Sequence, residues 1–85
     1  SNFMFIVYIL FSEKLNKYYI GFTSDLNARI IRHNQGGNSF TGKTNDWKIV
    51  YTEEFEEKTE AINREKQIKG WKSRKMVEKL ISLKN

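Results

Sequence analysis

Glu65 is the charged residue whose position most needs an explanation. It falls on the apolar face of a predicted helix, together with Ala61, Ile62 and Ile68. A carboxylate on that face should point into the protein, where a charge is costly unless it is paired, hydrogen-bonded or bound to a cation. Two alternatives stay open from this position alone. One is an ion pair with a nearby Lys or Arg, and the other is coordination of Mg²⁺ by one carboxylate, waters and a substrate phosphate.

Arg29 and His33 offer a second pair of groups suited to phosphate chemistry. They are four residues apart, so in a helix they share a face, one turn from each other. A guanidinium donates two parallel hydrogen bonds to a phosphoryl group, and an imidazole can exchange a proton near neutral pH. Taken singly, such residues are more often a surface arginine and a structural histidine. Their common face favours a functional interpretation only modestly.

Tyr8 and Tyr19 fall in two apolar segments that we expect to pair as strands. Tyrosine in such strands usually packs in the core, with its hydroxyl bonded to any available partner. A phenol, with a pKa of about 10, acts as a general base only when a neighbouring cation or a metal-bound water assists it. The two tyrosines therefore indicate catalysis only in combination with other residues.

Three segments are predicted to form a small sheet. Residues 5–11 are apolar throughout and rich in β-branched and aromatic types, which is typical of a central strand covered on both faces. A polar turn separates them from the apolar-aromatic residues 18–22, so these two segments should form an antiparallel hairpin. Gly21 is expected to end the second strand. Residues 47–55 predict a third, more exposed strand at an edge.

A first helix should run from about residue 25 to residue 33, because residues that favour N-caps precede apolar residues at helical spacing. The candidate caps are Thr23, Ser24 and Asp25. The following residues, 34–46, contain three glycines together with Asn, Ser and Thr. This composition predicts a long polar loop, in which a helical turn could lie.

Two further helices are predicted after the third strand. Thr59 should cap the first of them, with Arg64 and Lys66 turned away from the protein and Gly70 at its end. Ser73 should cap the last helix. Its predicted buried stripe comprises Met76, Val77, Leu80 and Ile81.

The composition suits one α/β domain (α+β) over residues 4–85, a small sheet with flanking helices. The 85 residues can build one modest core, and 12 aromatic residues favour a packed globule. With no cysteine and one histidine, a disulfide framework and a zinc finger are excluded, so a bound metal would be held mostly by oxygen. The longest apolar run, residues 3–11, is too short to span a membrane, and we expect no membrane contact and a cytoplasmic location.

The net charge of +5 comes from the last third of the chain. Residues 1–57 carry six Lys or Arg and seven Asp or Glu, whereas residues 58–85 carry nine and three. Such a segment suits a polyanion such as nucleic acid, although a solvated helix surface would look the same. The candidate phosphate contacts are Lys43 in the polar loop and, directly after Glu65, Lys66, Lys69, Lys72, Arg74 and Lys75.

In combination, these residues resemble the motif series of the GIY-YIG nuclease superfamily. The series is Ile6-Val7-Tyr8, Tyr19-Ile20-Gly21, Arg29, His33 and, in a later helix, Glu65. Order, residue type and spacing agree over nearly the whole chain, and YYIGFTSDLNARIIRHN and EKQIKGWKSRK are more specific than the two tyrosines. Ile6 stands where the first motif opens with glycine. The sequence is most similar to small single-domain bacterial members of this superfamily, and it is more distantly similar to the nuclease domain of excinuclease C.

The resemblance implies a three-stranded antiparallel sheet flanked by helices, and a role for each residue of the series. Tyr8 would be the base for the attacking water, with Tyr19 orienting or relaying and His33 assisting proton transfer or positioning Tyr8. Arg29 would contact the scissile phosphate and stabilise its developing charge. Glu65 would hold one Mg²⁺ or Mn²⁺, which would polarise the phosphoryl oxygen and stabilise the leaving oxyanion.

The resemblance also gives Gly21 a structural task, because a side chain at this position would intrude on the site. We therefore expect a metal-dependent endonuclease that hydrolyses nucleic-acid phosphodiesters, with DNA as the expected substrate and a protein partner as a source of specificity. An alternative is a catalytically silent nucleic-acid-binding module of the same fold, against which intact Tyr8, Arg29 and Glu65 argue. A third is a protein-interaction domain whose basic surface meets an acidic partner.

Overall fold

The sheet is built around β1 (Phe5–Ser12), which lies between β2 (Lys17–Thr23) and β3 (Lys48–Phe55) and is antiparallel to both. The computed structural model describes residues 4–37 and 40–84. All three predicted strands are confirmed to within one residue at each end. As expected, the apolar first segment is the central strand and the third lies at an edge.

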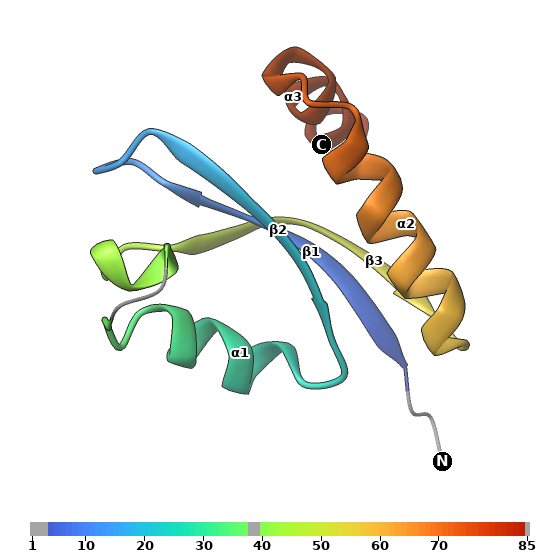
Figure 1. Ribbon diagram of the computed structural model, residues 1–85, viewed down its shortest axis with the longest axis horizontal. Helices are drawn as coiled ribbons and strands as arrows, with labels where there is room; N and C mark the ends of the chain where they lie inside the picture. The colour runs from blue at the N-terminus through green and yellow to red at the C-terminus, as the bar shows by residue number, and fades with distance from the viewer. Residues whose placement is uncertain (1–3, 38–39, 85) are drawn as a thin grey trace.

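Helices cover both faces of this sheet (Figure 1). On one face lie α1 (Leu26–His33) and the 3₁₀ turn η1 (Thr41–Lys43), and on the other lie α2 (Lys58–Gly70) and α3 (Arg74–Ser82). The predicted α+β fold is therefore confirmed, and the helical turn within the polar loop is η1. Among the described residues, no helix has the length and apolar character needed to cross a membrane.

Alternate residues of β1 contribute to two separate hydrophobic cores. Val7 and Ile9 are fully buried on the side of α2 and α3, whereas Tyr8 and Leu10 are buried on the side of α1. Fully burying an aliphatic side chain stabilises a fold by about 1.5–3 kcal/mol. The two cores explain why the sequence of this strand is apolar at consecutive positions rather than at every second one. The chief partners in the first core are Tyr51, Ala61, Ile68 and Val77, and in the second Trp47, Leu26 and Ile30.

Two of the predicted helix caps are confirmed and one is wrong. Asp25 and Ser73 are the N-caps of α1 and α3, and each side chain accepts a hydrogen bond from the backbone N–H three residues further on. Thr59 does not cap α2, which already begins at Lys58. The connection from β3 consists of residues 56–57 only, so the chain enters the helix earlier than the candidate cap suggested.

The predicted buried stripe of α3 is only partly correct. Val77 is buried, and Leu80 and Ile81 pack against the core with part of their surface exposed. Met76 is 45% exposed. It lies one residue before Val77, and a helix that contacts the core along a narrow line leaves such a neighbour in solvent.

Asp46 holds the turn between β1 and β2 against the segment that leads into β3. Its carboxylate accepts hydrogen bonds from Ser12 Oγ at 2.6 Å, Thr44 Oγ1 at 2.7 Å and the backbone N–H of Lys14 at 3.0 Å. These bonds, that from Ser12 first, lower the pKa of Asp46. Ser12 is fully buried, so its hydroxyl needs such a partner.

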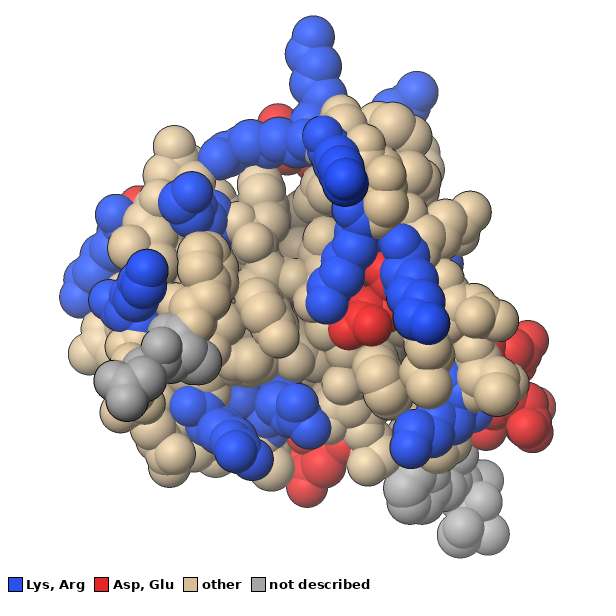
Figure 2. All heavy atoms as spheres, in the orientation of Figure 1, with Lys and Arg blue, Asp and Glu red and all other residues tan. Residues whose placement is uncertain are grey.

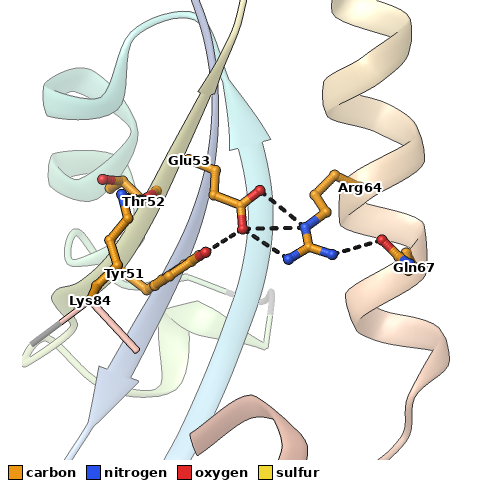
Figure 3. Close-up of polar contacts among 6 residues, drawn as sticks. All are labelled: Tyr51, Thr52, Glu53, Arg64, Gln67 and Lys84. Atoms are coloured by element: carbon orange, nitrogen blue, oxygen red, sulfur yellow. Dashed lines mark hydrogen bonds and ion pairs between the residues drawn. The ribbon is translucent and has the colours of Figure 1, made fainter. Parts of the chain in front are cut away.

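Contrary to the prediction, Arg64 on α2 does not face away from the protein but binds β3 (Figure 3). Its Nε and Nη2 atoms donate to the carboxylate of Glu53 at 3.0–3.2 Å, and Nη1 donates to Gln67 at 2.7 Å. The hydroxyl of Tyr51 donates to the same carboxylate. We call Tyr51, Glu53 and Arg64 the α2 clamp, because they join this helix to the edge of the sheet.

Partial burial and mutual pairing shift the pKa values within the α2 clamp. Burial opposes ionisation of Glu53, but the hydrogen bonds from Arg64 and Tyr51 outweigh it, and the pKa of the carboxyl falls below its ordinary value. Burial, with the charge of Glu53, raises the pKa of Tyr51 to about 12. The clamp is therefore most stable with Glu53 ionised and Tyr51 protonated.

Acid should weaken the α2 clamp. Because the pKa of Glu53 is lower in the folded protein than in the unfolded chain, its contribution is present above the unfolded value and is lost as pH falls through the folded value. We expect Glu53→Gln to lower the free energy of unfolding at pH 7 by about 1–3 kcal/mol and to flatten its decline toward pH 3.

Urea unfolding followed across this pH range measures both effects. Glu54→Gln is the matched control, because Glu54 lies on the same strand but is exposed. Parallel stability profiles for Glu53→Gln and the original protein would rule out the clamp as a source of acid sensitivity.

Candidate active site

Tyr8, Tyr19 and His33 meet on the face of the sheet that α1 covers. Tyr8 comes from β1, Tyr19 from β2, and His33 is the last residue of α1. The centroid of the Tyr19 ring lies 6.4 Å from that of Tyr8 and 4.8 Å from that of His33. Three residues that are far apart in the sequence thus form one polar and aromatic cluster.

A buried hydrogen bond joins β1 to the end of α1. Tyr8 Oη lies 2.9 Å from His33 Nε2, and His33 Nδ1 lies 2.8 Å from Thr41 Oγ1 on η1. Tyr8 is 1% exposed and His33 is 8% exposed, so both polar groups need these partners. In the tautomer with Nδ1–H donating to Thr41, Nε2 accepts the hydrogen bond from the phenol.

Gly21 provides the space for the ring of Tyr8. The two residues are paired across the β1–β2 ladder, and a Cβ added at Gly21 would lie 2.6 Å from Tyr8 Oη and 2.8 Å from its Cζ. Any side chain here would therefore displace the phenol from His33. The prediction that Gly21 ends its strand is wrong, because β2 continues to Thr23.

Arg29 and Glu65 bring opposite charges to Tyr8 from two helices. Figure 1 shows β2 passing between α1, which carries Arg29, and α2, which carries Glu65. Burial raises the pKa of Tyr8, Tyr19 and Glu65 raise it further, and the guanidinium of Arg29 opposes them. The five residues of the predicted site are thus close enough to interact electrostatically around one phenol.

His33 is kept neutral by its surroundings. Burial lowers its pKa from the ordinary value of 6.5, and the positive charges of Arg29 and Arg32 lower it further. A neutral imidazole can accept a proton at Nε2, the atom next to Tyr8 Oη. The protonated phenol and the neutral imidazole therefore form a donor–acceptor pair at neutral pH.

Glu65 is in the protein-facing position that the sequence predicts, with 16% of its side chain exposed. Its carboxylate pairs with Lys69 Nζ at 3.4 Å, which is the first of the two alternatives considered. Lys69 is half exposed, so this pair is weak and the carboxylate can still accept a cation. Among the described residues, no three His, Asp or Glu side chains lie together so that they could hold a metal ion. One carboxylate with waters and phosphate oxygens suits Mg²⁺.

An open cleft of about 470 Å³ leads to this cluster from the side of α1. Figure 2 shows a hollow in this face of the molecule, with Lys and Arg side chains on several sides of it. A polyanion could approach the cluster through this opening without passing a buried charge. The polar side chains that line the cleft include Tyr19, Arg29, Arg32, His33 and Thr41.

The predicted phosphate contacts do not form one row. Lys66 is exposed on α2, and Lys43 on η1 lines a separate groove beside the polar loop. Lys69 and Lys72 line another groove, along β2. Arg74 lies there too, but its guanidinium donates to the backbone oxygen and to Oδ1 of Asn16, both at 2.7 Å, and so helps to hold the β1–β2 turn.

Sequence reasoning missed Thr41 and the residues that fix it. The side chain of Asn34 donates to Trp47 O at 3.1 Å and accepts from Trp47 N at 2.8 Å, which closes the polar loop at its two ends. Trp47 Nε1 then donates to Thr41 O at 2.7 Å. Thr41 is thereby held beside His33. The loop offers several Ser, Thr and Asn side chains, so composition could not indicate which of them would meet the imidazole.

A model of the GIY-YIG catalytic domain matches residues 4–79 of the chain. The protein belongs to the GIY-YIG family. It is 42% identical over 65 residues to a UPF0213 protein of Staphylococcus saprophyticus, a match that covers 75% of this chain and 78% of the relative. It is 40% identical over 58 residues to a UPF0213 protein of Staphylococcus aureus, covering 67% and 71%.

The fold also matches a solved UPF0213 structure. The solution NMR structure of the protein from Bacillus halodurans aligns with a TM-score of 0.62 and 35% identity, over 95% of this chain and 85% of that chain. The two motifs that give the GIY-YIG family its name lie here on β1 and β2, which are adjacent strands. Their pairing brings the tyrosine of the first motif opposite the glycine of the second.

Removal of a neighbouring charge should raise the pKa of His33. We expect Arg29→Gln to move it toward the ordinary value, because Arg29 disfavours the protonated ring. His33 is the one histidine of the sequence, so an NMR titration of its ring protons gives the value directly. Lys48→Gln, at an exposed position on β3, is the control. An unchanged pKa in Arg29→Gln would show that this arginine does not act on the imidazole.

Proposed function

We propose that residues 4–85 act as one nuclease domain that hydrolyses phosphodiester bonds of nucleic acid, with DNA as the substrate and one divalent cation as cofactor. The observation that carries this proposal is the Tyr8–His33 pair at 2.9 Å, with Arg29 and Glu65 close enough to act on the same phenol. A metal-assisted phosphoryl transfer uses a proton acceptor, a cation for the phosphoryl oxygens and a metal ligand. Membership of the GIY-YIG family supports the same assignment.

Arg29 is the residue best suited to bind the scissile phosphate. It is exposed on α1 and lines the cleft, so its guanidinium can reach a ligand without first being uncovered. Two parallel N–H donors would hold two phosphoryl oxygens and fix the phosphorus relative to Tyr8. Positive charge at this point also stabilises the negative charge that develops in the transition state.

Tyr8 is better suited to relay a proton than to act as a base alone. Its pKa is raised above the ordinary value of 10.0, so at neutral pH the phenol is protonated. As the attacking water bonds to phosphorus, its proton passes to Tyr8 Oη while the phenolic proton passes to His33 Nε2. The imidazolium that forms is the final acceptor of this proton, and Thr41 stabilises it through Nδ1–H.

Glu65 would hold the Mg²⁺ or Mn²⁺ ion. When bound, the ion supplies charge that stabilises the phosphoryl oxygens and the leaving oxyanion. The pair with Lys69 is weak, and Lys69 can move away from the carboxylate when a cation binds, because half of its side chain is exposed.

Loss of the Glu65 carboxylate should abolish cutting but not binding. We expect Glu65→Gln to reduce the cleavage rate by about 100-fold or more, since the metal ligand is lost while the positive surface remains. Cleavage of supercoiled plasmid and of branched oligonucleotides is measured with Mg²⁺, Mn²⁺ or EDTA, and binding by gel shift in EDTA. Glu60→Gln, at an exposed position on the same helix, is the control.

Full activity in Glu65→Gln would remove Glu65 from the mechanism. Binding by every form without cutting of any substrate would contradict the nuclease proposal. That result would favour a silent nucleic-acid-binding module of the same fold.

Deletion of the Tyr8 hydroxyl should interrupt the proton path. Tyr8→Phe is expected to lower kcat by about 100- to 10,000-fold, with KM nearly unchanged, because the ring still fills its place. The activity of the original protein should fall as pH drops through the pKa of His33, which lies below 6.5, since only the neutral imidazole accepts the proton. Ser82→Ala removes an exposed hydroxyl at the end of α3, away from the site, and is the control.

Steady-state kinetics from pH 5 to pH 8 measures both effects. A rate for Tyr8→Phe equal to that of Ser82→Ala would assign the proton transfer to another group.

A further inference from the structure

A second groove, of about 330 Å³, follows the open edge of β2 beside the junction of α2 and α3. Four of its lining residues are cationic, and none of the described residues that line it is acidic. Two of these cations pair with carboxylates outside the lining, Lys69 with Glu65 at 3.4 Å and Arg74 with Glu78 at 3.2 Å. Both cations are about half exposed, so these pairs are weak and the groove keeps an excess of positive charge. The cationic and aromatic residues that line it are Lys17, Tyr18, Phe40, Lys69, Lys72 and Arg74.

Lys69 and Phe40 connect this groove to the candidate active site. Lys69 lines the groove, and its Nζ lies 3.4 Å from Glu65 and 6.0 Å from the centroid of the Tyr19 ring. Phe40 also lines the groove, and its ring is stacked with Tyr19 at a centroid distance of 6.5 Å. A chain lying in the groove would therefore reach Glu65 and Tyr19 at one end.

Phe40 is an exposed aromatic ring in a basic setting. Its side chain is 42% exposed, although its ring centroid lies 6.0 Å from that of Trp47 and 6.5 Å from that of Tyr19. A ring beside these two residues could have been more deeply buried. An exposed aromatic face on a positive surface suits a nucleobase, which stacks on it. Inside a duplex both faces of each base are covered by neighbouring bases, so the ring suits an unpaired base rather than a base within a duplex.

Lys72 places a charge in the groove at a local conformational cost. Its φ of 49° lies in the left-handed region, which glycine and asparagine adopt more easily than lysine. Gly70, two residues earlier, has no positive φ. The lysine thus stands where the backbone would favour glycine, and its side chain lines the groove.

Arg74 forms the far end of the groove. The guanidinium of Arg74 lies over the ring of Tyr18 at 5.1 Å and is held by two hydrogen bonds to Asn16. Arg74 therefore forms part of the wall, and the cations that can adjust to a ligand are the exposed Lys17, Lys69 and Lys72. Flexible ammonium groups of this kind suit the phosphates of a backbone without a fixed geometry.

We propose that this groove binds an unpaired strand of nucleic acid next to the candidate active site. One base would stack on Phe40, and the phosphates would lie along Lys17, Lys69 and Lys72. The proposal rests on the proposed function and narrows its substrate class to nucleic acid with a single-stranded segment beside the scissile phosphate. It follows from three features of one surface: positive charge, an exposed ring and continuity with Glu65.

The test is the binding of a fluorescein-labelled ten-nucleotide oligothymidine and of a duplex of equal length, followed by fluorescence anisotropy in EDTA. We expect Phe40→Ala to weaken single-strand binding by about tenfold and to leave duplex binding nearly unchanged, because only the unpaired base loses its stacking partner. Phe40→Trp should restore binding. Ile49→Ala is the matched control, because Ile49 is 40% exposed on β3 and does not line the groove.

A second variant tests the charges. Lys72→Gln should weaken single-strand binding and reduce the slope of log Kd against log salt concentration by about 0.7, the value for one phosphate contact. Lys48→Gln, outside the groove, should leave the slope unchanged. Equal effects of Phe40→Ala and Ile49→Ala, or equal effects of Phe40→Ala on the two ligands, would overturn the proposal.

Because binding is measured in EDTA, its outcome is independent of catalysis. Cutting without the Phe40-dependent preference for a single strand would disprove the groove proposal and leave the nuclease intact. A Phe40-dependent preference for a single strand without any cutting would support the groove proposal and contradict the nuclease proposal.

Discussion

The buried hydroxyl of Tyr8 is the group on which the site depends. A phenol with 1% of its surface exposed must have a hydrogen-bond partner, and His33 provides it at 2.9 Å. That bond is possible because Gly21 leaves room for the ring and because Thr41 holds the imidazole from its other side. Two linked hydrogen bonds thus join β1, the end of α1 and the polar loop.

Two consecutive residues of α2 have different roles at the site. Arg64 binds Glu53 on β3. Burial raises the pKa of Tyr8, and Glu65, next to Arg64 in the chain, lies close enough to raise it further. Adjacent residues of an α-helix point about 100° apart, so one helix can anchor to the sheet edge and present a carboxylate to the site at once. The α2 clamp therefore sets where the carboxylate stands as well as how firmly the helix is held.

The sequence predicts those features of the fold that depend on local pattern. The apolar run of β1, the caps Asp25 and Ser73 and the protein-facing position of Glu65 all follow from periodicity or capping chemistry. The pairing of Arg64 with Glu53 and the contact of Thr41 with His33 could not be predicted, because each joins segments whose relative position arises only in the tertiary structure. The strand pattern alone would have placed Tyr8 and Tyr19 in an ordinary core. The resemblance to the family is what brought them into the candidate site.

One set of positive charges has two effects at this site. Arg29 and Arg32 line the cleft through which a polyanion would approach. Burial lowers the pKa of His33, and the two arginines lower it further. Before a phosphate binds, they keep the imidazole neutral and able to accept a proton. A phosphate bound at Arg29 would partly neutralise that charge and so raise the affinity of His33 for a proton at the moment when the attacking water must release one. In the proposed mechanism, substrate binding and proton acceptance would therefore be coupled through the same arginine.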